Sequence, residues 1–245
     1  MIAFSAIMTI VLGGLLSITA VGLKPMQQKA IRLDTRKQIL SAVMELTGKE
    51  DVLTLYDLRT KSLVVTATGE VVKTDKDGNP LVAEEVNVGK EYKKPVEERL
   101  LPVFQFMSES DPNQIEAYIL PVYGNGLWNK IWGFVALETD LNTIKGFSMD
   151  HKAETPGLGA RITSKDIQNR YVGKKLFDDQ GNLVSVEMLK GERGDPSLFN
   201  EHQVDGMSGA TLTAKGVNKM LKNYMDYYRP FFKRISSGEE LASIQ

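Results

Sequence analysis

Cysteine is absent from this 245-residue sequence, histidine occurs only twice, and neither sign of charge is in excess. Without cysteine the chain cannot form disulfides, zinc ribbons, thiolate-ligated iron–sulfur clusters or a catalytic thiol. A formal net charge of −1, from 30 basic and 31 acidic residues, argues against a nucleic-acid partner. Hydrophobic residues at 42% and charged residues at 25% are typical of a folded chain and exclude wholesale disorder.

The two histidines, His151 and His202, are too few and too far apart in sequence to suggest a metal centre. Structural roles are the simpler expectation for both. No Ser/His/Asp arrangement and no Walker phosphate-binding sequence is present. We therefore expect neither a metal site nor a catalytic side chain.

Charge is missing altogether from residues 1–23, of which 16 are hydrophobic. The 22 residues of 2–23 would form a helix roughly 33 Å long, enough to cross the hydrocarbon core of a bilayer. A cleaved signal peptide is the alternative, but no basic region begins the segment and no small-x-small site precedes Lys24. The sequence predicts a membrane anchor over residues 1–24, and so a membrane partner.

Five basic residues follow this segment, and none precedes it: Lys24, Lys29, Arg32, Arg36 and Lys37. The positive-inside rule, applied directly, places the remaining body in the cytoplasm. That rule is weak for large domains, which translocate largely regardless of flanking charge.

Hydrophobic periodicity predicts short strands mixed with helices in the body. Helices are expected at 28–47, 164–171 and 213–228; strands at 63–72, 81–88, 116–123, 131–138 and 143–150; and a hairpin at 177–189. Without a regular βαβ alternation, this is an α+β body with a mixed or antiparallel sheet. The expected divisions are a membrane-proximal α+β region at 25–115, a ligand-binding domain at 116–230 and a tail at 231–245.

The first candidate site lies immediately before the last predicted helix, in the sequence Asp-Gly-Met-Ser-Gly-Ala-Thr at residues 205–211. Small side chains let an anionic group approach the backbone, and a helix N-terminus offers free N–H donors to a phosphate. Ser208 and Thr211 add hydroxyl groups. The motif predicts a phosphate site, with an ordinary capped turn as the alternative.

The second candidate is the sequence Glu-Thr-Pro-Gly-Leu-Gly at residues 154–159. Pro156 fixes one backbone angle, and Gly157 and Gly159 allow the backbone to approach a flat ligand. The loop is no dinucleotide fingerprint, because the third glycine is missing. Trp128, just after a glycine turn, could stack on an aromatic cofactor or simply occupy a hairpin tip.

Together these motifs resemble the FMN-binding domain family, in which flavin is attached through its phosphate to a threonine hydroxyl. The family's Asp-x-x-(Ser/Thr)-Gly-Ala-Thr pattern is matched here without departure, and residues 154–159 match its second loop. Within the family, the full length is similar to the C subunits of Na⁺-translocating NADH:quinone reductases. The G subunits of the Rnf ferredoxin:NAD complex are the nearest alternative.

The resemblance implies one FMN, joined by a phosphoester to Thr211 and installed by a flavin transferase that recognises the Asp205 motif. It implies further cofactor contacts from these residues: Glu154, Thr155, Pro156, Gly157, Leu158, Gly159, Ser208, Gly209, Ala210, Leu212, Lys215 and Trp128. It also implies an electron-relay role among other membrane subunits of the complex, in a bacterial inner membrane. The body would then be periplasmic, against the charge rule, and we follow the resemblance because the body is large.

A tethered module without redox function, in which the Ser-Gly-Ala-Thr turn is incidental, is the remaining alternative. A colourless protein from cells containing the transferase would favour it.

Overall fold

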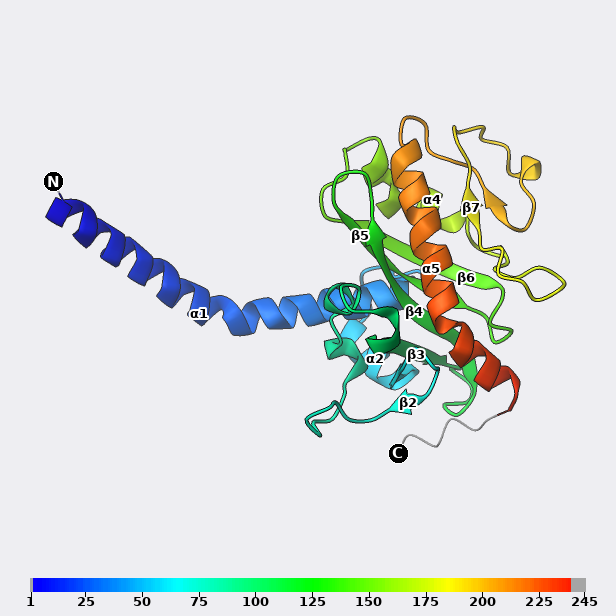
Figure 1. Cartoon of the computed structure of the whole chain (residues 1–245), viewed down its shortest axis with the longest axis horizontal. Coiled ribbons are helices and arrows are strands. Elements are labelled where there is room, and N and C mark those ends of the chain that lie inside the picture. Colours follow the sequence, from blue (N-terminus) through cyan, green and yellow to red (C-terminus); the bar gives the residue numbers. More distant parts are fainter. Residues whose placement is uncertain (1, 239–245) are drawn as a thin grey trace.

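The computed structural model describes residues 2–238, and Met1 and residues 239–245 lie outside the described part. A long helix, α1 (Ile2–Ser41), projects from a body built on one six-stranded sheet. Figure 1 shows α1 extending far from the body before its last turns reach it. This is the expected α+β architecture with an antiparallel sheet.

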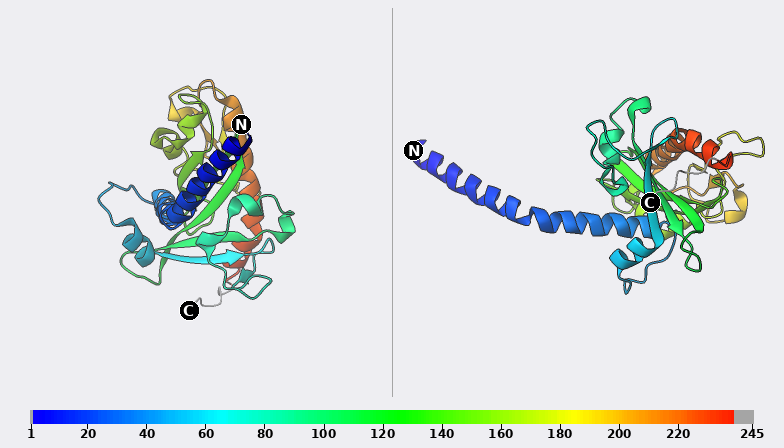
Figure 2. Two further views of the ribbon diagram at one scale, coloured as in Figure 1. Left: turned by 90° about the vertical axis from the view of Figure 1, so that its left-hand side faces the viewer. Right: turned by 90° about the horizontal axis from the view of Figure 1, so that it is seen from below.

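α1 is one continuous helix that joins the apolar segment to the helix expected at 28–47. It is long and apolar enough to cross a membrane, and none of its apolar window is buried against the body. Figure 2 shows a bend part-way along it. Pro25 lies inside the helix, where its missing N–H and its ring disturb the hydrogen-bond ladder.

The helix ends at Ser41 rather than at the expected residue 47. The N–H of Ala42 bonds to the Ile39 carbonyl three residues back, which tightens the last turn. The backbone of Ala42 lies so close to Gly146 of β6 (Ile144–His151) that a Cβ atom on Gly146 would collide with the Ala42 carbonyl oxygen. The end of α1 is therefore fixed by contact with the sheet.

The sheet has the strand order β2-β1-β3-β4-β5-β6, with antiparallel pairing throughout. Its strands are β1 (Thr60–Val65), β2 (Val71–Val72), β3 (Leu101–Met107), β4 (Ile115–Asn125), β5 (Lys130–Leu137) and β6 (Ile144–His151). The hairpin expected from 116–123 and 131–138 forms as β4 and β5, and the strand expected at 143–150 forms as β6. β3 and β4 are adjacent, so one sheet extends across the division expected at residue 115, and that division stays a prediction.

Both faces of the sheet are buried, each under helices (Figures 1 and 2). Leu63 and Val65 of β1 face the cluster beneath the C-terminal helix α5 (Thr211–Ser236), whereas Val64 faces the end of α1 and α2 (Val52–Arg59). Alternate strand residues point to opposite faces. This explains why β3 is buried along its whole length.

Two strand predictions were wrong. Residues 63–72 form two strands rather than one, because Gly69 adopts φ +80° and the Thr66 N–H bonds to the Glu70 carbonyl in a tight turn. Residues 81–88 form no strand but a 3₁₀ turn, Ala83–Glu85. There Glu84 accepts hydrogen bonds from Arg36 and Ala83 is buried, so tertiary contacts override the strand propensity.

Short elements complete the body: α3 (Val88–Glu91), η2 (Val96–Glu98), η3 (Gly159–Thr163), α4 (Lys165–Asn169) and η4 (Pro196–Leu198). The hairpin expected at 177–189 is reduced to a single bridge between Phe177 and Leu183. Its far end instead forms β7 (Glu187–Met188), which pairs in parallel with β8 (Gln203–Val204). β8 therefore leads directly into the candidate motif at 205–211.

α5 begins two residues before the expected residue 213 and continues past the expected end at 228. Pro230 suggests a stop, but the helix continues because Phe231 is buried against Tyr118 of β4 and Phe232 against Phe177. Residues 231–236 of the expected tail therefore belong to α5, and residues 239–245 lie outside the described part.

Candidate functional site

Three segments far apart in the sequence meet at the N-terminal end of α5, and the Glu154 side chain joins them. Its Oε2 accepts a 2.6 Å hydrogen bond from Thr213 Oγ1 in the first turn of α5. Its Oε1 accepts a 3.1 Å hydrogen bond from the backbone N–H of Trp128 at the β4–β5 tip. Only 4% of Glu154 is exposed. A buried carboxylate needs such partners, and their loss would leave its charge unsatisfied.

Two glycines are required by this junction. A Cβ atom on Gly126 would collide with Glu154 Oε1, and one on Gly159 would collide with Thr213 Oγ1. Gly157 serves differently: it adopts φ +74° and has open space around it. The glycines of the loop therefore allow close packing at one position and a turn at the other.

The turn at 208–211 presents an open helix terminus. α5 starts at Thr211, with Ala210 as a cap that supplies no side-chain hydrogen bond. Within residues 2–238, the N–H groups of Thr211, Leu212 and Thr213 have no hydrogen-bond acceptor. Such N–H groups and the positive end of the helix dipole favour a bound phosphate.

Gly209 shapes this turn with φ +74°. A Cβ atom there would also lie 2.8 Å from Leu158 Cδ2, so the two motifs are in contact. The structure thus brings together the two sequences, 154–159 and 205–211, that the sequence analysis singled out.

Exposed apolar side chains surround the junction. Trp128 is 67% exposed, Leu212 56% and Leu158 41%. The Trp128 indole N–H donates to Thr155 Oγ1 at 3.1 Å, which fixes the ring beside the loop. Exposed apolar groups next to an anion-binding helix terminus are suited to a flat aromatic ligand that carries a phosphate.

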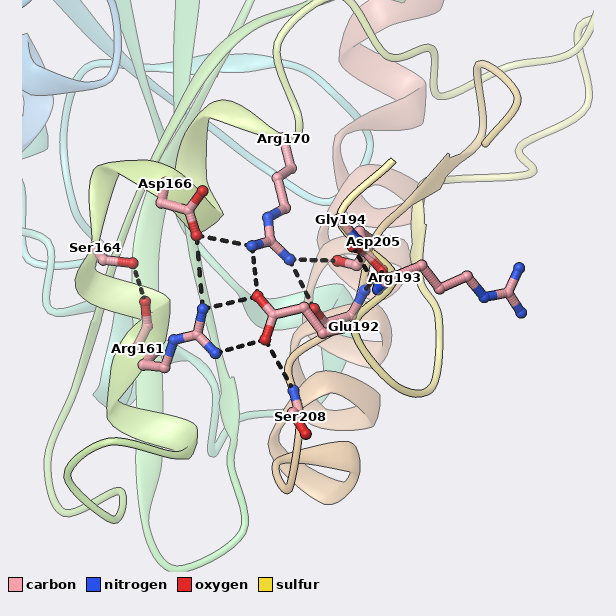
Figure 3. Close-up of polar contacts among 10 residues, drawn as sticks. Arg161, Ser164, Asp166, Arg170, Glu192, Arg193, Gly194, Asp205 and Ser208 are labelled. Atoms are coloured by element: carbon pink, nitrogen blue, oxygen red, sulfur yellow. Dashed lines mark hydrogen bonds and ion pairs between the residues drawn. The ribbon is translucent and has the colours of Figure 1, made fainter. Parts of the chain in front are cut away.

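Asp205 does not face the turn but holds a neighbouring loop (Figure 3). Its carboxylate accepts hydrogen bonds from the backbone N–H groups of Arg193, Gly194 and Gly206 at 2.7–3.0 Å. Only 8% of the residue is exposed. The first residue of the motif is therefore used here to order the chain at 193–194.

Glu192, next to that loop, lies in an ion-pair cluster beside the turn. Arg161 donates two hydrogen bonds to its carboxylate at 2.7 and 2.8 Å, Arg170 donates one at 2.7 Å, and the Ser208 N–H donates one at 3.4 Å. These donors hold the pKa of Glu192 well below its usual range. Sequence reasoning missed this cluster because its members are scattered and form no motif, and it missed Thr213 because that residue lies just past the motif.

Lys215 and the two histidines lie in different settings. Lys215 is exposed and lines a groove of about 450 Å³ with Lys219 and Lys222. His151 Nδ1 accepts a hydrogen bond from the Glu154 N–H, and His202 Nδ1 donates to the Lys175 carbonyl. Both histidines thus bond to the backbone, and residues 2–238 contain no cluster of acidic or histidine side chains able to hold a metal.

Comparisons with known proteins identify the family of the chain. Residues 126–226 match the FMN-binding domain family. Over 97% of its length the chain is 34% identical to the C subunit of the Na⁺-translocating NADH-quinone reductase of Neisseria meningitidis, covering 92% of that protein. The corresponding protein of Pseudomonas aeruginosa is 34% identical over 90% of the chain and 89% of its own length.

Solved structures give the same result. A crystal structure of the C subunit from Parabacteroides distasonis superposes with a TM-score of 0.70 at 31% identity, covering 91% of this chain and 98% of that one. The crystal structure of NqrC from Shewanella oneidensis gives a TM-score of 0.72 at 26% identity, covering 85% of this chain and 99% of that one. These similarities favour NqrC over the Rnf G subunit and over a module without redox function.

The chain therefore belongs to the NqrC family, the C subunits of the Na⁺-translocating NADH-quinone reductase, and is an oxidoreductase subunit with an FMN-binding domain.

Proposed function

We propose that Thr211 Oγ carries FMN as a phosphoester and that the chain relays electrons between other redox subunits of the complex. The observation that supports this most is the open N-terminus of α5, which begins at Thr211 itself. A phosphate on this hydroxyl would lie at the positive end of the helix dipole.

The residues present fit FMN. Unpaired N–H groups at 211–213 suit its phosphate, and Trp128, Leu158 and Leu212 offer an apolar border for its ring system. Flavin supplies the electron chemistry when bound, while the protein supplies attachment, orientation and electrostatic tuning. Glu154 and Thr155 act indirectly, by holding Trp128 and the first turn of α5 in place.

Attachment requires an activated flavin phosphoanhydride supplied by a transferase. The Thr211 oxygen forms a bond to the flavin phosphorus, the anhydride bond breaks, the second phosphate leaves as a phosphate monoester, and the hydroxyl proton passes to solvent. The net addition to the chain is FMN less one water. One site of this kind predicts one covalent FMN per chain.

Removal of single hydroxyl groups tests the attachment. Thr211→Ala, made together with the transferase, should lose the flavin fluorescence that survives denaturing gel electrophoresis, whereas Ser208→Ala removes the neighbouring exposed hydroxyl and should retain it. Persistence of the signal in Thr211→Ala would refute attachment at this residue.

We further propose that α1 anchors the chain in the bacterial inner membrane with the body on the periplasmic side, because a body of this size translocates largely regardless of flanking charge. The absence of cysteine makes this testable without background. Glu109, whose side chain is 92% exposed, can be changed to Cys in the full chain. A membrane-impermeant maleimide should label Glu109→Cys in intact spheroplasts and leave the unmodified chain unlabelled; labelling only after lysis would place the body in the cytoplasm.

A further inference from the structure

The Asp205 carboxylate is fully engaged inside the chain. Its two oxygens accept four hydrogen bonds from three backbone N–H groups, those of Arg193, Gly194 and Gly206. A carboxylate offers about four lone-pair positions, so little acceptor capacity is left for a partner enzyme. A residue in this position acts on the folded chain around it.

The loop that Asp205 holds carries Glu192, which extends from it toward the turn (Figure 3). Arg161 contributes from η3 a bidentate pair to Glu192, and Arg170, which follows α4, contributes a third hydrogen bond. The second terminal nitrogen of Arg170 donates to the Gly206 carbonyl at 2.7 Å. The cluster therefore ties the loop at 192–194, the start of the motif and the segment 161–170 into one unit.

Glu192 also touches the turn itself. Its Oε2 accepts from the Ser208 N–H at 3.4 Å, three residues before the expected attachment atom. Its side chain is 23% exposed, and those of Arg170 and Arg161 are 17% and 32% exposed. Partly shielded, bidentate guanidinium–carboxylate pairs hold geometry more firmly than exposed pairs do.

We propose that Glu192 is a positioning residue for flavin attachment at Thr211, and that Asp205 acts on attachment through it. This inference rests on the proposed function. Asp205 fixes residues 193–194, these place Glu192 between Arg161 and Arg170, and Glu192 fixes the Ser208 end of the turn. The position of Thr211 Oγ then depends on Glu192, although Glu192 is outside the family motif.

Direct recognition of Asp205 by the transferase makes different predictions. If the enzyme contacts Asp205, its loss raises the KM for this chain as acceptor, and Glu192 is irrelevant. If Asp205 acts through Glu192, either loss misplaces the hydroxyl and lowers kcat with little change in KM. The two losses are then not additive, because they remove the same constraint.

The experiment measures transferase kinetics with the full chain in detergent as acceptor and covalent flavin as the readout. The variants are Glu192→Gln, Asp205→Asn and their double variant, with Glu201→Gln as control. Glu201 also accepts a hydrogen bond from a basic side chain, that of Lys175 at 2.7 Å, but this pair is exposed at the surface. If Asp205→Asn fails to fold, Arg161→Gln and its double variant with Glu192→Gln test the same coupling.

We expect Glu192→Gln to lower kcat about tenfold or more with KM within about twofold, the double variants to match the more impaired single variants, and Glu201→Gln to behave as wild type. Wild-type kcat in Glu192→Gln, multiplying effects in the double variants, or a change confined to KM would each overturn the inference while leaving attachment intact. Absence of covalent flavin in the wild-type chain would instead overturn the proposed function and the inference with it.

Discussion

Removing the carboxylate of Glu154 should separate the three segments that form the site. Glu154→Ala eliminates two hydrogen bonds to a buried charged group and leaves the Thr213 hydroxyl and the Trp128 N–H without their acceptor. A hydrogen bond to a charged group contributes about 1.5–3 kcal/mol. Water can hydrogen-bond to the Trp128 N–H at the exposed hairpin tip and so offset part of the loss. We therefore expect the free energy of unfolding to fall by about 3 kcal/mol.

Thermal unfolding of the full flavin-free chain in detergent measures this loss. For a chain of this size about 1 kcal/mol corresponds to roughly 2–4 °C, so the Tm should fall by about 6–12 °C. Glu109→Ala, which removes an exposed carboxylate, should change the free energy of unfolding by less than about 0.5 kcal/mol. Thr213→Val should lower the free energy of unfolding by less than Glu154→Ala does. The loss in the double variant should be smaller than the sum of the two single losses.

An unchanged Tm in Glu154→Ala would show that packing alone holds the junction and that the two hydrogen bonds of Glu154 do not stabilise it. Additive losses in Glu154→Ala and Thr213→Val would contradict the direct 2.6 Å bond between them.

Three further substitutions test the turn, the ion-pair cluster and the core. Gly209→Ala should destabilise the chain by about 1–2 kcal/mol through its left-handed backbone, measured by thermal unfolding, and Leu158→Ala should not restore it because only the steric contact is relieved. Because its pKa is lowered on folding, ionised Glu192 stabilises the chain above the unfolded pKa of about 4.3, and this contribution is lost as the pH falls toward the folded pKa. The Tm of Glu192→Gln should therefore lie below that of wild type at pH 7 and approach the wild-type Tm in acid. A difference in Tm that stays constant with pH would contradict this. Tyr228→Phe removes a buried 2.7 Å hydrogen bond to the Pro102 carbonyl and should cost about 1–2 kcal/mol, or roughly 2–8 °C in Tm; an equal or higher Tm would show that the carbonyl finds another donor.

Long periodic segments were the predictable part of this fold. The β4–β5 hairpin and most of α5 follow from local hydrophobic patterns that also agree with the tertiary structure. Where local propensity and tertiary contact disagree, prediction failed. Residues 81–88 have β-branched character, but Glu84 bonds to Arg36 of α1, a contact that no local pattern could indicate.

The candidate site divides in the same way. Each of its two motifs is a continuous stretch of sequence, so sequence reasoning could single out Thr211 and residues 154–159 as candidates. It could not place Glu192 beside Ser208, because that contact depends on the loop that Asp205 orders and on two arginines from another segment. Motifs identify residues whose chemistry requires fixed spacing, whereas supporting residues are fixed by the fold.

The mass of the intact chain, produced together with its flavin transferase, is the most direct test of FMN attachment at Thr211. If Thr211 carries FMN, the mass increases by one FMN less one water, and peptide mapping localises the increase to the fragment that contains Thr211. An unmodified mass, or flavin on a fragment without Thr211, would contradict it.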